Sequence, residues 1–137
     1  GKSALVLALA GELPVETGSL LRMHKSLAYA EQEPWIMNGT IRENIVMGHG
    51  FDQEWYDQVI HACGLLPDLE TFANHDATIV GDRGVQCSGG QKARIGLARA
   101  LYIDSDVVLL DDPISAVDAR VAKHIYQHAI QRLCVKR

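Results

Sequence analysis

The chain has 137 residues, of which 47% are hydrophobic and 22% are charged, and its formal net charge is −4. This composition is typical of a folded domain with a modest core, so it excludes wholesale disorder and collagen-like structure. The small acidic excess gives no electrostatic reason to expect nucleic acid as a partner, and no apolar run approaches the roughly 20 residues of a membrane span. Three cysteines without a CxxC pair favour a reduced, cytosolic setting.

The amino-terminal part predicts one helix and two strands. Residues 2–10 are apolar on all sides and precede Gly11, which predicts a buried helix that ends at a glycine. Short apolar stretches at residues 19–22 and 27–30 predict strands. The chain begins without a methionine and stops inside a helical pattern, so we expect it to be a piece of a longer chain.

The middle of the chain predicts short helices with clear caps. Thr40 and Glu43 have the spacing of a capping box. Asp52 can cap the following helix, with Phe51 and Tyr56 placed as a hydrophobic staple. These signals predict a helix-rich middle.

The carboxyl-terminal part returns to an α/β pattern. Ser88 opens a helix in which Ile95 and Leu101 keep the helical period. Residues 106–112 contain four consecutive apolar side chains and end in two acids, which predicts a fully buried parallel strand. Asp118 can cap a last helix.

Two short motifs suggest a phosphate site, although neither is decisive alone. Gly1-Lys2-Ser3 before a helix matches the end of a Walker A loop, whose lysine and backbone N–H groups bind phosphates and whose hydroxyl binds Mg²⁺. An ordinary helix start explains the same tripeptide. The strand that ends at Asp111 matches Walker B, in which the aspartate holds Mg²⁺, but many α/β strands end in aspartate.

The third motif, at residues 88–91, carries more information. A capping box explains Ser88 and Gln91 but not Gly89 and Gly90, since each glycine in a helical turn costs about 1 kcal/mol relative to alanine. The glycine pair predicts that a bulky group approaches the backbone there. The positive end of the helix would suit an anion such as a terminal phosphate.

These motifs together resemble one family. Residues 87–94, Cys-Ser-Gly-Gly-Gln-Lys-Ala-Arg, resemble the signature of ATP-binding-cassette (ABC) ATPases, which usually reads Leu-Ser-Gly-Gly-Gln. Residues 115–118 resemble the family's D-loop, and Gln32 resembles its Q-loop glutamine. Residues 35–45 and 109–118 are similar to the multidrug-resistance-associated (C) subfamily, and most of all to its first nucleotide-binding domain.

The resemblance covers essentially the whole chain and implies an α/β fold. This is a P-loop NTPase (RecA-like) core with an inserted ABC helical subdomain, truncated at both ends. Residues 1–33 and 103–137 would form the partial core, and residues 34–102 the helical subdomain. The strand that feeds a P-loop is central in such sheets, so its absence predicts exposed apolar surface and an unstable or aggregating piece.

The resemblance also implies ATP and Mg²⁺ as ligands, and a role for each site residue. The residues implied to bind ATP are Gly1, Lys2, Ser3, Ser88, Gly89, Gly90, Gln91 and Asp118. Those implied at Mg²⁺ are Ser3, Gln32 and Asp111. In the family, the signature contacts the γ-phosphate of ATP that is bound to an opposing domain.

Catalysis falls on Gln32 and Asp112 by the same resemblance. The residue after the Walker B aspartate is normally a glutamate that polarises the attacking water, and here it is Asp112. One methylene fewer draws the carboxylate back by about 1.5 Å, and a misplacement of about 1 Å can cost roughly 10²-fold in rate. We therefore expect weak hydrolysis, and the first domain of the C subfamily often carries this aspartate.

Three functions fit the motifs. The first is the ATPase cassette of an exporter, at the cytoplasmic face of a membrane, paired with a second nucleotide-binding domain and with transmembrane domains. The second is a regulatory half-site that binds ATP and leaves turnover to its partner. The third, a chromosome-maintenance or DNA-repair ATPase head, is disfavoured because residues 33–87 are too few for a coiled-coil insertion and contain no sustained heptads.

Three further features have simpler interpretations. His124 and His128 have the i, i+4 spacing of metal ligands, but without a third ligand they predict a partly exposed helix face. Cys87 stands where the family has leucine, as a small apolar substitute. An exposed aromatic residue among residues 35–66 would support contact with the coupling helices of a transmembrane domain.

Overall fold

The computed structural model describes residues 1–13, 17–18 and 25–135 of the chain. In chain order the elements are α1 (Lys2–Ala10), β1 (Leu27–Ala30), β2 (Gly39–Thr40), α2 (Ile41–Val46), α3 (Gln53–Ala62), α4 (Leu66–Thr71), the 3₁₀ turn η1 (His75–Ala77), β3 (Ile79–Val80), α5 (Gly89–Tyr102), β4 (Val107–Leu110), α6 (Ala119–Ile125) and the π-helix η2 (Tyr126–Cys134). The strand expected at residues 19–22 lies outside the described residues. Within the described ranges, no helix combines the length and the hydrophobicity of a membrane span.

The strands β1 and β4 pair in parallel, with Leu27 opposite Val107. The pairing continues past β4, where the Asp111 N–H donates to the Ala30 carbonyl at 3.0 Å. The carboxyl ends of both strands therefore meet at one edge. The parallel strand predicted from residues 106–112 is confirmed, but β4 is half-buried rather than fully buried, because β1 is its only sheet neighbour in the described part of the chain.

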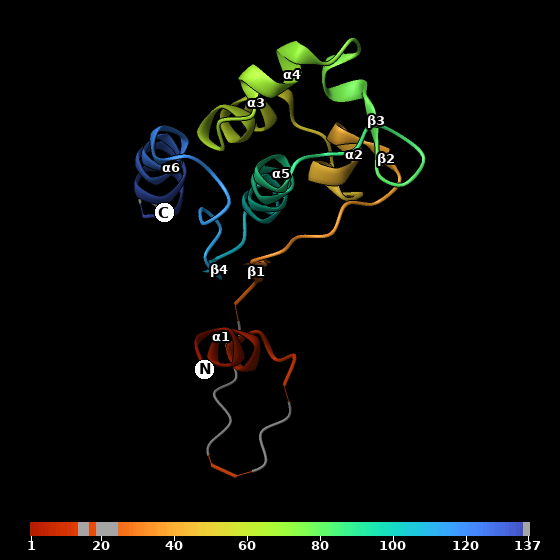
Figure 1. The fold of residues 1–137 in the computed structure, drawn as a ribbon. Helices are drawn as coiled ribbons and strands as arrows, with labels where there is room; N and C mark the ends of the chain where they lie inside the picture. The colour runs from red at the N-terminus through yellow and green to blue at the C-terminus, as the bar shows by residue number, and fades with distance from the viewer. Residues whose placement is uncertain (14–16, 19–24, 136–137) are drawn as a thin grey trace.

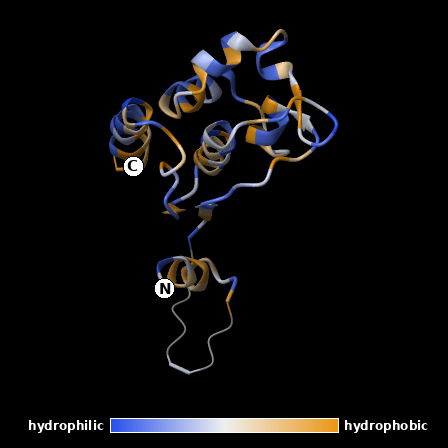
Figure 2. Cartoon of the chain, viewed as in Figure 1, coloured by the Kyte–Doolittle hydropathy of each residue, from blue (hydrophilic) through white to orange (hydrophobic). Residues whose placement is uncertain are grey.

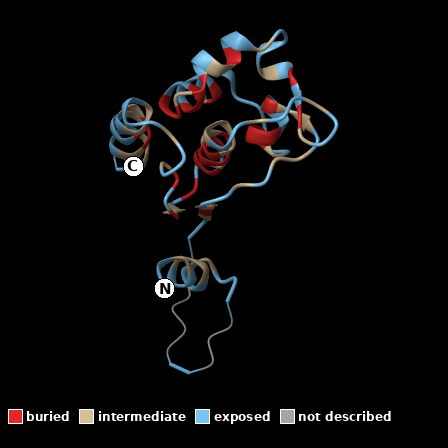
Figure 3. Ribbon diagram, viewed as in Figure 1, coloured by how far each residue is buried: buried red, intermediate tan, exposed pale blue. Residues whose placement is uncertain are grey.

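The helix α1 ends as predicted, at Gly11 in the left-handed conformation with φ 84°. The expectation that it is buried is wrong. No residue of α1 is buried, and Leu5 and Leu9 are 62% and 45% exposed. Figure 1 shows α1 apart from helices α2–α6, with β1 and β4 between them. The ribbon of α1 carries hydrophobic colours in Figure 2 and no buried residue in Figure 3. A helix that is apolar all round needs cover on every side, and the two described strands do not provide it.

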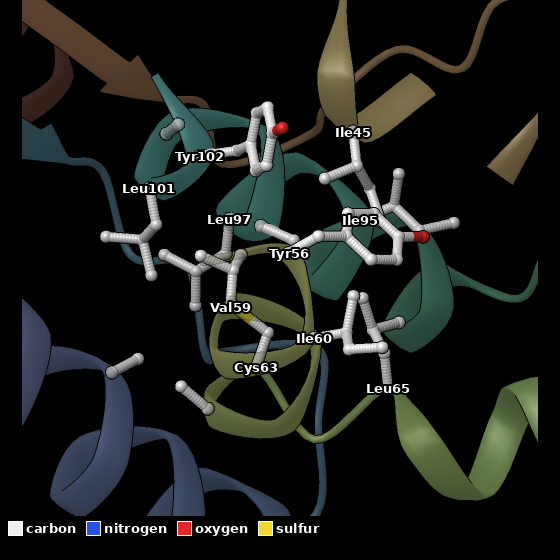
Figure 4. Close-up of a cluster of buried hydrophobic side chains, with 14 of the residues drawn as sticks. Ile45, Tyr56, Val59, Ile60, Cys63, Leu65, Ile95, Leu97, Leu101 and Tyr102 are labelled. Atoms are coloured by element: carbon white, nitrogen blue, oxygen red, sulfur yellow. The ribbon is translucent and has the colours of Figure 1, made fainter. Parts of the chain in front are cut away.

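The hydrophobic core forms around α5, which packs against α2, α3 and β1. Figure 4 shows the buried side chains of α3 and α5 facing one another. The Tyr102 hydroxyl donates to the Gly50 carbonyl at 2.8 Å and accepts from the Asp52 N–H at 2.9 Å, so it ties the start of α3 to the end of α5. The expected helix-rich middle is confirmed.

The predicted caps are also confirmed. Thr40 and Glu43 form the capping box of α2, and Asp52 accepts from the Trp55 N–H at the start of α3. The Phe51 and Tyr56 rings of the expected staple lie 5.5 Å apart. Because these contacts are local in sequence, residue spacing alone was enough to predict them.

The expected last helix is present, but it changes its hydrogen bonding midway. It begins as α6 and continues as the π-helix η2, and Ile125 and Ala129 are fully buried. This packing places η2 against α3.

At Gly96 the segment before β2 crosses α5 in close contact. A Cβ atom on Gly96 would lie 2.4 Å from the Cβ of Pro34, a separation that van der Waals repulsion forbids. The missing side chain lets the segment after β1 lie directly on α5, the helix that begins at Gly89.

We predict that Gly96→Ala destabilises the protein by about 1–3 kcal/mol, because the overpacking against Pro34 outweighs the helix propensity of alanine. Denaturant unfolding would measure the change. Gly89→Ala is the matched control, since a Cβ there would meet nothing within 4 Å and should leave stability equal or slightly higher. Equal stability of the two variants would show that the crossing is not tight.

Candidate functional site

The carboxyl edge of β1 and β4 borders a pocket of about 540 Å³. Ser3, Gln32 and Asp111 all line it, although they come from three separate parts of the chain. We call it the Walker pocket. The structure therefore brings together the three residues that the sequence predicted at Mg²⁺.

Asp111 is the buried acid of this pocket, with 9% of its surface exposed. The Tyr29 hydroxyl lies 3.4 Å from its Oδ2 atom and donates to it. Burial, and next the charge of Asp111, raise the pKa of Tyr29, so the phenol keeps its proton. Tyr29 belongs to no motif, and its only signal in the sequence is its place on a predicted strand three residues before Gln32.

The lining residues fit a bound Mg²⁺ ion. A hydroxyl, an amide and a carboxylate offer the hard oxygen ligands that Mg²⁺ prefers, and Asp111 is held partly out of solvent. In the described part of the chain, no three His, Cys, Asp or Glu residues form a metal cluster. Mg²⁺ needs no such cluster where one carboxylate and substrate phosphates hold it.

Gly1 and Lys2 are exposed and do not line the Walker pocket. Gly1 is the N-cap of α1 and offers no side chain to the N–H groups of the first turn. Those groups leave a partial positive charge at the helix end. The geometry thus places Ser3 in the pocket and Lys2 beside it on the same turn.

Residues 88–91, which we call the signature turn, form the expected capping box. The Ser88 Oγ accepts from the Gln91 N–H at 3.2 Å, and the Gln91 Oε1 accepts from the Ser88 N–H at 2.9 Å. A Cβ on Gly89 would meet open space, whereas one on Gly90 would lie 3.0 Å from the carbonyl oxygen of Ala116. The prediction of a bulky neighbour is therefore corrected at Gly90, because the group that approaches it belongs to the same chain.

The signature turn does not reach the Walker pocket. Gly89 lines a second pocket of about 420 Å³, which shares only Gln32 and Glu33 with the first. We call it the Gly89 pocket. Within one chain, the two predicted phosphate-binding segments therefore lie in different places.

Asp112 does not line the Walker pocket in this structure. It is exposed, and its backbone is left-handed with φ 51°. The carbonyl of Asp112 accepts from the Ser115 N–H at 3.4 Å and the Ser115 Oγ at 3.1 Å, so this residue starts the turn that leads to residues 115–118.

Asp118 has a local role that the sequence predicted. Its Oδ1 accepts from the N–H groups of Val121 at 3.0 Å and Arg120 at 2.9 Å, which caps α6. These bonds, that of Val121 first, lower the pKa of the Asp118 carboxyl. Asp118 lines a third pocket, of about 480 Å³, that includes His61 and His124 but not Ser3.

The histidine pair has a third member that the sequence analysis missed. The His61 ring of α3 lies 5.2 Å from the rings of both His124 and His128, which are 4.4 Å apart. Desolvation, and next the neighbouring His124, lower the pKa of His128. No signal in the sequence links His61 to residues more than 60 positions away. We interpret the cluster as packing between α3 and the last helix.

Two smaller expectations agree with the structure. Burial raises the pKa of the half-buried Cys87, as befits a small apolar substitute rather than a reactive thiol. Among residues 35–66, Trp35 and Phe51 are 49% and 47% exposed, so exposed aromatic side chains are present where a contact with a transmembrane domain was considered. The Arg99 guanidinium lies over the Trp35 ring at 4.1 Å and holds it in place.

Comparison with known proteins agrees with these motifs. A family model described as "ABC transporter" matches residues 1–115. The chain is 52% identical over 130 residues to mouse "ATP-binding cassette sub-family C member 4", covering 95% of this chain and 10% of the relative. It is 50% identical over 137 residues to "Bile pigment transporter 1" and 48% identical over 130 residues to "Metal resistance protein YCF1", both from Saccharomyces cerevisiae, each covering 95% of this chain and 9% and 8% of the relatives.

The chain thus spans about a tenth of the length of these curated relatives or less. The relatives nevertheless cover 95% of this chain, and the family match includes residues 1–3, 32, 88–91 and 111 of the two pockets and the signature turn. The chain belongs to the ABC transporter family, and its sequence is about half identical to those of members of sub-family C.

Proposed function

We propose that the chain is part of the first ATP-binding cassette of an exporter and binds ATP with Mg²⁺ at the cytoplasmic face of a membrane. It would hydrolyse ATP weakly and work in a head-to-tail pair with a second nucleotide-binding domain. The observation that carries the proposal is the meeting of Ser3, Gln32 and Asp111 in the Walker pocket. Among the described residues, no feature favours the alternative of a DNA-repair ATPase head.

The separation of the two pockets supports the head-to-tail pair. The signature turn is the positive end of the 14-residue helix α5, and Gly89 leaves its backbone open. It lies outside the chain's own Walker pocket. A phosphate that reaches this turn would therefore be held by another cassette, and ATP would join the two.

The residues of the chain would act mainly by position and charge. Bound Mg²⁺ would neutralise phosphate charge, with Ser3, Gln32 and Asp111 as its protein ligands. The first turn of α1, with Gly1 and Lys2, would bind phosphate oxygens through N–H groups and the ammonium. Gln32 would also orient the attacking water.

The proposed domain division follows the elements. Residues 1–33 and 103–137 would form the core, because they contain α1, β1 and β4. Residues 34–102 would form the helical subdomain, which contains α2–α5. The exposed rings of Trp35 and Phe51 would face a transmembrane domain.

Asp112 favours a regulatory variant of this function. Its carboxylate is one methylene shorter than the usual glutamate, and its side chain does not line the Walker pocket. A cassette with this residue would bind ATP and leave most turnover to a partner.

We predict that Asp111→Asn lowers the affinity for ATP in the presence of Mg²⁺ by about tenfold or more, because a charged metal ligand is lost. Without Mg²⁺ the affinity should not fall. Titration of the purified protein with a fluorescent ATP analogue, with and without Mg²⁺, measures both values.

The matched control for this experiment is Asp57→Asn, on the helix α3. The Asp57 carboxylate accepts from the Gln53 side-chain amide at 2.8 Å and does not line the Walker pocket. It should leave the Mg²⁺ dependence unchanged. ATP binding by the unmodified protein that is indifferent to Mg²⁺ would contradict the proposed site.

We predict that Asp112→Glu raises ATP turnover by roughly tenfold or more, because the longer side chain brings the carboxylate to the water. Phosphate release at saturating ATP measures this. Asp104→Glu is the control, since Asp104 is likewise left-handed, with φ 54°, and does not follow the strand that ends at Asp111 or line the Walker pocket. Unchanged turnover in Asp112→Glu would refute the argument from side-chain length.

A further inference from the structure

The Asp68 side chain of α4 contacts the signature turn. Asp68 lies between Leu65 and Leu69, which are 1% and 6% exposed, so its backbone is fixed by the core. Its Oδ1 accepts from the Gln91 Nε2 at 3.1 Å, and its Oδ2 lies 2.8 Å from the Nη2 of Arg94. Both charged side chains are mostly covered, with 17% and 12% exposed.

Arg94 carries the contact further. Its Nε donates to the Gly90 carbonyl at 3.2 Å and its Nη1 donates to the Gly64 carbonyl at 3.3 Å. The guanidinium thus joins the backbone of the signature turn to the backbone just after α3. Since its planar fork points three donors in fixed directions, it allows little freedom between these groups.

The Asp68 carboxylate also favours one of the two orientations of the Gln91 amide. A carboxylate only accepts hydrogen bonds, so it requires the NH₂ end of the amide. The oxygen end then faces the Ser88 N–H, at 2.9 Å, and completes the capping box. The Ser88 N–H, which can only donate, requires the same orientation, so Asp68 and Ser88 hold the two ends of the amide together.

We propose that Asp68 is a positioning residue for ATP-dependent association, which orients the signature turn toward the nucleotide of the opposing cassette. This inference rests on the proposed function. Asp68 touches no nucleotide itself; it acts through Gln91 and Arg94. It makes the geometry of the signature turn depend on where α4 lies.

The test compares Asp68→Asn with Asp76→Asn in the purified protein, with the proposed second nucleotide-binding domain present. Asp76 forms the matched ion pair, at 2.8 Å to Arg42, with 15% of its side chain exposed and no contact with the signature turn. Analytical ultracentrifugation with ATP and Mg²⁺ measures association, and titration with a fluorescent ATP analogue measures affinity at the Walker pocket.

Asp68→Asn should weaken ATP-dependent association about tenfold, because a charge-assisted bond that fixes the turn is lost. Affinity at the Walker pocket should stay within about twofold, since that pocket is lined by other residues. Asp76→Asn should change neither quantity. An equal loss in both variants, or normal association of Asp68→Asn, would overturn the inference.

A second variant separates positioning from stability. Asp68→Asn combined with Arg94→Gln removes both charges, so the melting temperature should recover at least in part. Association should stay weak, because the turn is still not oriented. Recovery of association together with stability would overturn the inference. A wild-type protein that binds ATP but never associates would instead overturn the head-to-tail function, and this inference with it.

Discussion

The parallel pairing of β1 and β4 is the constraint on which the Walker pocket depends. At its carboxyl end the Asp111 N–H donates to the Ala30 carbonyl. At its amino end the Asp106 carboxylate accepts from both the N–H and the hydroxyl of Ser26, at 3.0 and 2.9 Å. These bonds lock the register at both ends. A slip of one residue would turn Asp111 to the opposite face of the sheet, away from Gln32.

The segment that follows β1 connects this pocket to the signature turn. Gln32 and Glu33 line both the Walker pocket and the Gly89 pocket. Two residues on from Gln32, Pro34 lies on α5 at the position where only Gly96 fits. If a bound nucleotide displaced this segment, Pro34 would press directly on α5. The two segments that we propose to bind phosphate therefore line different pockets, and the segment after β1 borders both.

Local and motif-based features were predictable from the sequence, and contacts between distant segments were not. The caps of Ser88 and Asp118 depend on neighbours within three residues, so spacing revealed them. Asp68 and His61 contact residues that are more than 20 positions away, and no periodicity in the sequence predicts such contacts. The burial of α1 was mispredicted for a related reason. Hydropathy shows that an apolar helix needs other elements to cover it, but not whether the rest of the fold provides that cover.

The backbone at Asp112 gives the shortened carboxylate a structural reason. The chain must turn after β4 to bring Ala116 against Gly90, and it does so through a left-handed residue whose carbonyl bonds to Ser115. Aspartate is among the few residues with a side chain that tolerate this conformation, whereas glutamate lacks its short local hydrogen bonds. The aspartate that we propose to weaken hydrolysis thus suits the turn that brings residues 115–118 against α5. At position 112, a longer side chain would bring the carboxylate closer to the attacking water, but it would fit the left-handed backbone less well.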